Sequence, residues 1–176
     1  MPEKQSGRLV LVRAGQSAAA PQELGSDPAV GQIRSARPDR GDDMHVLVVE
    51  VHEQHVHAML CGEECELATD TDAVLEPEVT GLARRVLIHG DVSGSILKRR
   101  LGRALGQIDP DLAERIALRG RGLDFTATDL GRGTSIADDS DPRWQWKLKQ
   151  HRQLRRVRAR ASELGWEIYK LGPREE

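Results

Sequence analysis

The chain has 176 residues, which is long enough for one domain with a hydrophobic core and an additional segment. Aromatic residues make up only 3% of it, so the core must be built from aliphatic side chains. The sequence contains no run of about 18 apolar residues, which excludes a membrane-spanning helix. Two cysteines and no recognisable export signal lead us to expect a cytoplasmic protein without a structural disulfide.

The charge is unevenly distributed along the chain. The formal net charge is −2, but residues 143–176 carry 10 Lys and Arg residues against 4 Asp and Glu residues. The C-terminal part therefore has a charge of about +6 and the remainder about −8. A concentrated basic segment can bind phosphate whatever the total charge is.

The first half of the chain has the pattern of a β protein. Residues 7–14 (GRLVLVRA) alternate as a strand does, and residues 15–43 are rich in Ala, Gly, Pro and Asp, which indicates a long loop. Met44–Val51 is a nearly continuous apolar run typical of a buried strand. Residues 56–60 predict a second strand that forms a hairpin with it.

The second half adds strands and then helices. Further strands are expected within 68–77 and 83–89, and Asp109-Pro110 is a strong helix start for a helix that stops at Gly120. The chain is thereby divided into a barrel domain over 1–119, a Gly- and Asp-rich linker over 120–142 and a basic amphipathic helix over 143–171.

Potential metal ligands are concentrated in the hairpin. His52, His55, His57, Cys61 and Cys65 fall within fifteen residues, and zinc prefers four converging Cys or His ligands. Their spacing matches no standard zinc pattern, and the alternative is a set of exposed hairpin histidines with two ordinary thiols. We expect no metal and no other cofactor.

The order of the segments resembles the MazF/PemK family of toxin endoribonucleases over about residues 7–119. The segments that carry this resemblance are GRLVLV at 7–12, Arg37-Pro38 ahead of Met44–Val51, ATDTDAVLEPEVTGL at 68–82 and RLGRALGQIDPDL at 100–112.

The resemblance implies an α+β fold: a small, strongly bent antiparallel β-barrel of SH3-like type with short helices, here followed by a long C-terminal helix. Members of the family are usually homodimers and are neutralised by an antitoxin. They cut single-stranded RNA without a metal, by attack of the ribose 2′-OH on the adjacent phosphate. That reaction needs a cation over the developing negative charge and a group that protonates the leaving oxygen.

Two catalytic positions carry over from the resemblance. The family arginine corresponds to Arg37, with Arg34 and Arg40 as neighbours that could replace it, and the family hydroxyl residue corresponds to Cys61. A thiol is a weaker hydrogen-bond donor than a hydroxyl and tends to be buried. The alternatives are a solvated loop arginine at 37 and a packed strand-end thiol at 61.

Other basic residues are candidates for RNA contacts. They are Arg34 and Arg40 beside Arg37, Arg84 and Arg85, Lys98 in the run Lys98–Arg100, and Arg152, Arg155 and Arg156 in the C-terminal segment. Short charge runs also occur as solvated faces, and the basic helix could instead bind an acidic protein or the acidic body of this chain. Trp144 and Trp146 either stack on unpaired bases or anchor this helix to the barrel.

Two functions follow. The first is a divergent MazF/PemK-like, metal-independent endoribonuclease. The alternative is a catalytically degenerate barrel that binds nucleic acid or a protein through its basic helix. In a third arrangement, the chain is the toxin half of a pair whose antitoxin covers its groove.

Overall fold

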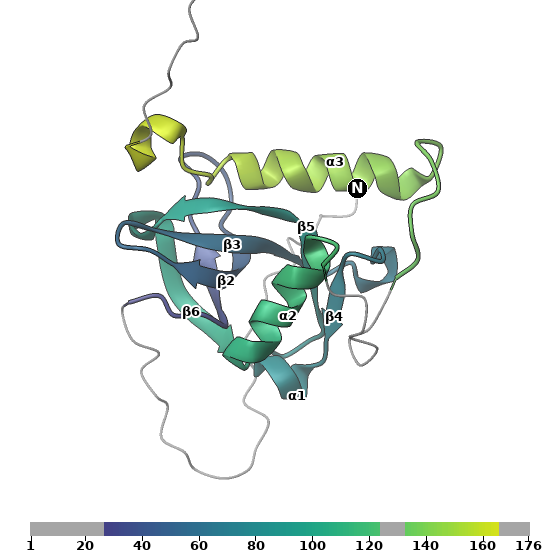
Figure 1. The fold of residues 1–176 in the computed structure, drawn as a ribbon, viewed down its shortest axis with the longest axis horizontal. Coiled ribbons are helices and arrows are strands. Elements are labelled where there is room, and N and C mark those ends of the chain that lie inside the picture. The colour runs from purple at the N-terminus through teal and green to yellow at the C-terminus, as the bar shows by residue number, and fades with distance from the viewer. Residues whose placement is uncertain (1–26, 124–132, 166–176) are drawn as a thin grey trace, which may run out of the picture.

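The computed structural model describes residues 27–123 and 133–165 (Figure 1). The strand expected over 7–14 and the end of the helix expected over 143–171 lie outside these residues. Helices are present, but none in the described ranges is both long and apolar enough to cross a membrane.

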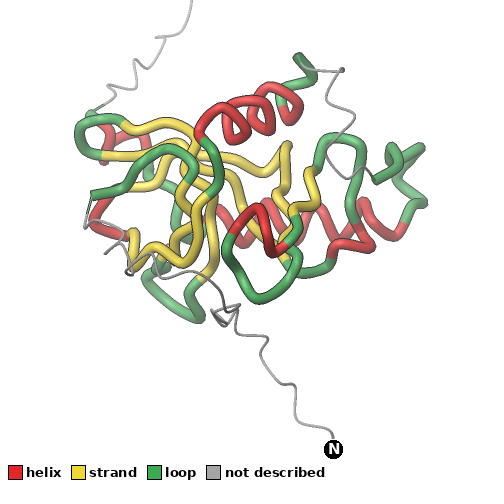
Figure 2. The backbone as a smooth tube through the Cα atoms, turned by 90° about the horizontal axis from the view of Figure 1, so that it is seen from below, coloured by secondary structure: helices red, strands yellow, loops and turns green. Residues whose placement is uncertain are grey.

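Six strands form one antiparallel sheet in the order β4-β5-β3-β2-β1-β6. Figure 2 shows these strands as one group with the helical segments around it. The strands are β1 (Gln32–Ala36), β2 (Met44–Val51), β3 (His55–Gly62), β4 (Ala73–Leu75), β5 (Val86–Leu97) and β6 (Leu101–Gln107). The helical segments are η1 (Cys65–Leu67), α1 (Pro77–Thr80), η2 (Lys98–Arg100), α2 (Pro110–Gly120), α3 (Pro142–Arg155) and η3 (Ala161–Leu164).

Both faces of the sheet are apolar, and a different helix covers each. In β2 the side chains alternate, so that Leu47 joins one buried cluster and Val48 the other. The first cluster includes Ile116 of α2, and the second includes Leu154 of α3. Figure 1 shows α2 in front of the strands and α3 lying across the top of the sheet. The nearly continuous apolar run of Met44–Val51 is explained by burial on both faces.

The prediction of a long loop over 15–43 is wrong for its second half, because β1 lies there. Gly31, with φ of +87°, turns the chain into β1, and Ile33 is fully buried between β2 and β6. The short strand also contains Gln32, Arg34 and Ser35, so it lacks an apolar alternation that would reveal it in the sequence. The strand that precedes Arg37-Pro38 is therefore β1, and the loop that follows it spans only residues 37–43.

The predicted helix start at Asp109 is confirmed. The carboxylate Oδ1 of Asp109 accepts a hydrogen bond from the backbone N–H of Asp111 at 2.8 Å, and Pro110 occupies the first turn. The helix α2 ends at Gly120, as expected.

The helix predicted over 143–171 is wrong over residues 156–165, because α3 ends at Arg155. The backbone N–H of Ala159 donates to the carbonyl of Ser95 at 2.7 Å, and Arg158 forms an antiparallel bridge with Ile96. The second half of β5 extends beyond the short strand β4, so its outer edge has unpaired backbone groups that residues 158 and 159 satisfy. The chain leaves the helix because this pairing and the burial of Val157 replace further helical turns.

The sheet brings its two edges near each other, since α1, which follows β4, contacts β6. No strand pairing joins β4 to β6 in the ranges that the structure describes. The mixed fold with an antiparallel sheet is confirmed, and the closed SH3-like barrel stays a prediction.

Candidate nucleic-acid interface

The loop at residues 37–43 is held against η2. The backbone N–H of Arg37 donates to the carbonyl of Arg100 at 2.8 Å. In return, the guanidinium of Arg100 contacts a carboxylate oxygen of Asp39 at 3.2 Å. These contacts fix the loop beside the start of β2, although its sequence is rich in Pro, Asp and Gly.

The end of α3 completes the same surface. The side chain of Arg156 donates to the carbonyl of Arg40, and the side chain of Arg100 donates to the carbonyl of Arg156 at 3.4 Å. Gly41, with φ of +94°, lies under the Arg156 guanidinium, where a side chain would collide with it. Three distant segments thus gather Arg37, Arg40, Arg100 and Arg156, which we call the arginine surface.

Carboxylates are interspersed in the arginine surface. Arg37, whose side chain is 74% exposed, forms an ion pair of 3.7 Å with Asp43. Glu163 of η3 lies 3.1 Å from the Arg99 guanidinium and 3.9 Å from that of Arg100. A backbone hydrogen bond from Arg160 lowers the pKa of Glu163 below its usual range, and the two nearby arginines lower it further. The surface is therefore basic but partly neutralised, and incoming phosphates must compete with exposed ion pairs that are individually weak.

The structure brings together Arg37, predicted as catalytic, and Arg40 and Arg156, predicted to contact RNA. Arg152 and Arg155 are exposed on the last turns of α3, and Lys98 is half-buried in η2 beside Arg99 and Arg100. Arg84 and Arg85 lie elsewhere, in a small hollow that they share with Glu63, Cys65 and Glu66. The sequence pointed to the run Lys98–Arg100, and only the fold selects Arg100 from it.

Arg34 is not available to RNA, contrary to the prediction. Its side chain is buried, and its Nε and Nη2 both donate to the carbonyl of Gly102, at 3.0 and 2.8 Å. Its Nη1 donates to the amide oxygen of Gln32 at 2.8 Å. Burial lowers the pKa of Arg34, with a smaller opposing effect of Asp27. Arg34 joins β1 to β6, which could not be foreseen from a residue assigned to a loop.

Cys61 lies in the hydrophobic core, where its thiol faces the cluster that contains Leu47 and Met59. Burial raises the pKa of this thiol well above its usual range. A buried, protonated thiol is inert. This placement matches the alternative of a packed strand-end thiol.

His45 is the partner of Cys61 across the β2–β3 ladder, and both residues contribute to the lining of a hollow. Burial lowers the pKa of His45, while Asp43 acts in the opposite direction. At neutral pH the imidazole is therefore uncharged and can accept a proton. Asp43 connects it to the arginine surface, because Arg37 pairs with that carboxylate.

A hollow of about 340 Å³ adjoins the arginine surface, and we call it the α3 hollow. Its lining comes from the end of loop 37–43, from the paired ends of β2 and β3, and from one face of α3: Asp42, Asp43, Met44, His45, Leu60, Cys61, Gly62, Glu63, Glu64, Lys149, Gln150, Gln153 and Arg156. Nothing in the sequence indicated that α3 would form one wall of a hollow at this place.

The helix α3 is fixed to the sheet by a buried ion pair that the sequence analysis missed. Lys147 Nζ lies 2.5 Å from Asp72 Oδ1 and 2.6 Å from Asp91 Oδ1, and the side chains of Lys147 and Asp72 are almost fully buried. Asp72 also accepts hydrogen bonds from the backbone N–H groups of Thr69 and Gly90. The pattern of the basic helix gives no means of telling Lys147 from its exposed neighbours.

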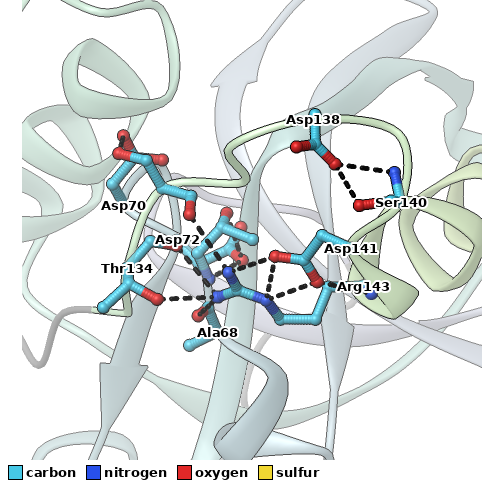
Figure 3. Close-up of polar contacts among 10 residues, drawn as sticks. Ala68, Asp70, Asp72, Thr134, Asp138, Ser140, Asp141 and Arg143 are labelled. Atoms are coloured by element: carbon cyan, nitrogen blue, oxygen red, sulfur yellow. Dashed lines mark hydrogen bonds and ion pairs between the residues drawn. The ribbon is translucent and has the colours of Figure 1, made fainter.

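Arg143 fastens the N-terminus of α3 to the chain before it (Figure 3). Its guanidinium contacts the carboxylate of Asp141 at 2.6 Å, the carbonyl of Thr134 at 2.9 Å and the carbonyl of Ala68 at 3.4 Å. Asp141 also caps the helix by accepting from the Arg143 backbone N–H at 2.9 Å. Arg143 therefore serves the fold rather than a ligand.

The histidines and cysteines of the hairpin are spread over separate places. His52 and His55 stack with their ring centroids 4.4 Å apart, His57 Nε2 lies 3.2 Å from the Ser93 hydroxyl, and Cys61 is in the core. Within the described ranges, no three His, Cys, Asp or Glu side chains are grouped so as to hold a metal ion.

Comparisons with known proteins gave matches only among solved structures. No family model matches the chain. No curated protein matches it either. The chain is similar to the Mycobacterium tuberculosis toxin MazF-mt6, with 20% identity and a TM-score of 0.43 over 53% of this chain and 99% of that chain. It is also similar to a structure described as a crystal structure of an Mtb toxin, with 18% identity and a TM-score of 0.40 over 51% of this chain and 97% of that one. MazF is also the family that the sequence resembles.

Proposed function

We propose that this protein is a divergent MazF/PemK-like toxin that binds single-stranded RNA on the arginine surface and cleaves it without a metal. The observation that carries the proposal is the junction of Arg156 with loop 37–43, which adds its charge to those of Arg37, Arg40 and Arg100. Guanidinium groups suit phosphate because they offer a planar set of donors and keep their charge.

The reaction that we propose is attack of a ribose 2′-OH on the neighbouring phosphate, which leaves a 2′,3′-cyclic phosphate and a free 5′-hydroxyl. Arg37 is well suited to the developing charge on the phosphate, since its side chain is exposed and its carboxylate partner is weakly held. His45 is the group that we propose for proton transfer in place of Cys61, because Asp43 connects it to Arg37 and burial lowers the pKa of its imidazole.

The experiment uses the full-length protein and a long single-stranded RNA in EDTA. Wild type is compared with Arg37→Ala, His45→Ala and the charge-matched control Arg121→Ala, whose guanidinium pairs with Glu50 on the α2 side of the sheet. We expect cleavage in chelator that is lost with Arg37→Ala, falls by at least about 100-fold with His45→Ala and is retained in the control. Cleavage that survives Arg37→Ala would refute this site.

A second candidate is RNA binding without cleavage. The burial of the Cys61 thiol in the core favours it, because burial raises the pKa of this thiol at the position that resembles the family hydroxyl. Salt-sensitive RNA binding by a wild-type protein that forms no cyclic phosphate would identify this alternative.

An antitoxin and a homodimer belong to the same proposal. An acidic antitoxin segment that neutralises the arginine surface would compete with RNA for the same guanidinium groups. Mass measurement of the purified protein in solution tests the dimer, and co-purification with the product of an adjacent gene tests the antitoxin.

A further inference from the structure

The α3 hollow is lined by a polar side chain that makes no side-chain hydrogen bond within the described part of the chain. Gln150 is only 5% exposed, lines the hollow and makes no side-chain hydrogen bond to any residue that the structure describes. A carboxamide carries two donor hydrogens and an acceptor oxygen, and those of Gln150 remain accessible from the hollow. Its position therefore suits a ligand that offers both donors and acceptors.

Four carboxylates lie on the other side of the hollow. Glu63 and Glu64 follow the end of β3, and Asp42 and Asp43 come from loop 37–43. Ionised carboxylates accept hydrogen bonds and do not donate them. A ligand bound here must therefore present N–H groups toward these residues.

The hollow opens beside the proposed path of the RNA. Arg156 belongs both to its lining and to the arginine surface. The volume of about 340 Å³ lies at the lower end of the range for small-molecule sites. Proteins that read single-stranded RNA take bases out of the stack and hydrogen-bond to their edges.

We infer that the α3 hollow binds one unpaired nucleobase of the RNA and selects guanine over uracil. This inference rests on the proposed function. Guanine presents N1–H and N2–H side by side, which a single carboxylate accepts through both oxygens, and its O6 accepts from an amide such as that of Gln150. Uracil presents one N–H between two carbonyl oxygens, and these oxygens repel the carboxylates. A basic side chain from a protein partner would donate to the amide oxygen of Gln150 but would leave its amide N–H groups without an acceptor.

The test measures binding of the full-length protein to two fluorescent 2′-O-methyl oligonucleotides, which cannot be cut by 2′-OH attack. One is an 11-residue oligouridylate, and the other carries a single central guanine. We expect wild type to bind the guanine oligonucleotide about tenfold more tightly. The double variant Glu63→Gln/Glu64→Gln and the variant Gln150→Leu should bind both oligonucleotides within about twofold of each other, close to the wild-type affinity for oligouridylate.

Glu66→Gln is the matched control, because Glu66 is an exposed glutamate of the same segment outside the hollow. It should retain the guanine preference. Equal wild-type affinities for the two oligonucleotides would overturn the inference and leave the proposed function standing. The double variant Glu63→Gln/Glu64→Gln removes only a half-buried and an exposed carboxylate, so it should fold. A guanine preference that persists in this variant would also overturn the inference. Absence of binding to either oligonucleotide would overturn the proposed function, and this inference with it.

Discussion

Lys147 of α3 contacts Asp72, 75 residues earlier in the chain, with its Nζ 2.5 Å from the carboxylate Oδ1. Both side chains are almost completely buried. This ion pair joins α3 to the turn before β4. The C-terminal helix is thus part of the folded body and not a detachable basic tail.

Loss of the ammonium group should destabilise the fold strongly. In Lys147→Ala the carboxylate of Asp72 remains buried and loses its cation, so we expect the free energy of unfolding to fall by about 3–5 kcal/mol. Urea denaturation followed by circular dichroism measures this change. Lys149→Ala, two residues along on an exposed position, should change it by no more than about 0.5 kcal/mol. Similar small effects of both variants would contradict the buried ion pair.

Removal of α3 by truncation before Pro142 should give an aggregating protein. Leu154 of the helix and Val157, two residues past its end, cover Val48, Leu60 and Ile96. A large newly exposed apolar patch promotes association. For this reason the RNA experiments use point variants, and a monodisperse, folded truncation by light scattering would argue against the packing described here.

Acidification should weaken the fold through His89. Burial, together with the nearby Lys147, lowers the pKa of His89 to about 3, and neither ring nitrogen has a hydrogen-bond partner in the described residues. The unfolded chain binds a proton near pH 6.5 and the folded one does not, so the stability is complete above that pH and falls as the pH drops from about 6.5 toward 3. The contribution approaches about 1.4 kcal/mol for each pH unit.

The measurement is urea denaturation at several pH values between 7 and 5. His89 faces Asp72, Asp91, Trp146, Lys147 and His151, so His89→Leu removes only the imidazole from this group. We expect a flatter dependence of stability on pH in His89→Leu than in the wild type. An unchanged slope in His89→Leu would assign the acid sensitivity to other residues.

Salt dependence should distinguish the arginine surface from other basic positions. Arg156→Ala should lower RNA affinity for all sequences alike and reduce the slope of the logarithm of the affinity against the logarithm of the salt concentration by about 1. Fluorescence anisotropy between low and moderate salt measures the slope. Arg121→Ala removes the same charge from the α2 side and should leave it unchanged.

Cys61 should matter for stability and not for RNA. Its thiol is buried in the core, so Cys61→Ala should cost about 1–2 kcal/mol of stability and leave RNA binding and cleavage intact. Alkylation followed by mass spectrometry should modify the half-buried Cys65 before Cys61. Loss of RNA cleavage in a folded Cys61→Ala protein would restore the catalytic role that the resemblance suggested.

The sequence by itself determined the strands of the β2–β3 hairpin, the start and end of α2, and the presence of a basic helix after a Gly- and Asp-rich segment. These features depend on local signals: continuous apolar runs, an Asp-Pro helix start and a terminal glycine. The short strand β1 was missed because its pairing with β2 and β6, and not its own pattern, stabilises it.

Only the tertiary structure decided which polar residues work together. It buries Arg34 and Cys61, it selects Lys147 as a core cation, and it places Arg156 on the carbonyl of Arg40, 116 residues away. It also ends α3 at Arg155, because the free edge of β5 takes the following residues into its ladder. A charged side chain has the same local sequence signal whether it is solvated, buried in an ion pair or free to bind phosphate. The physical difference lies in the neighbours that the fold brings to it.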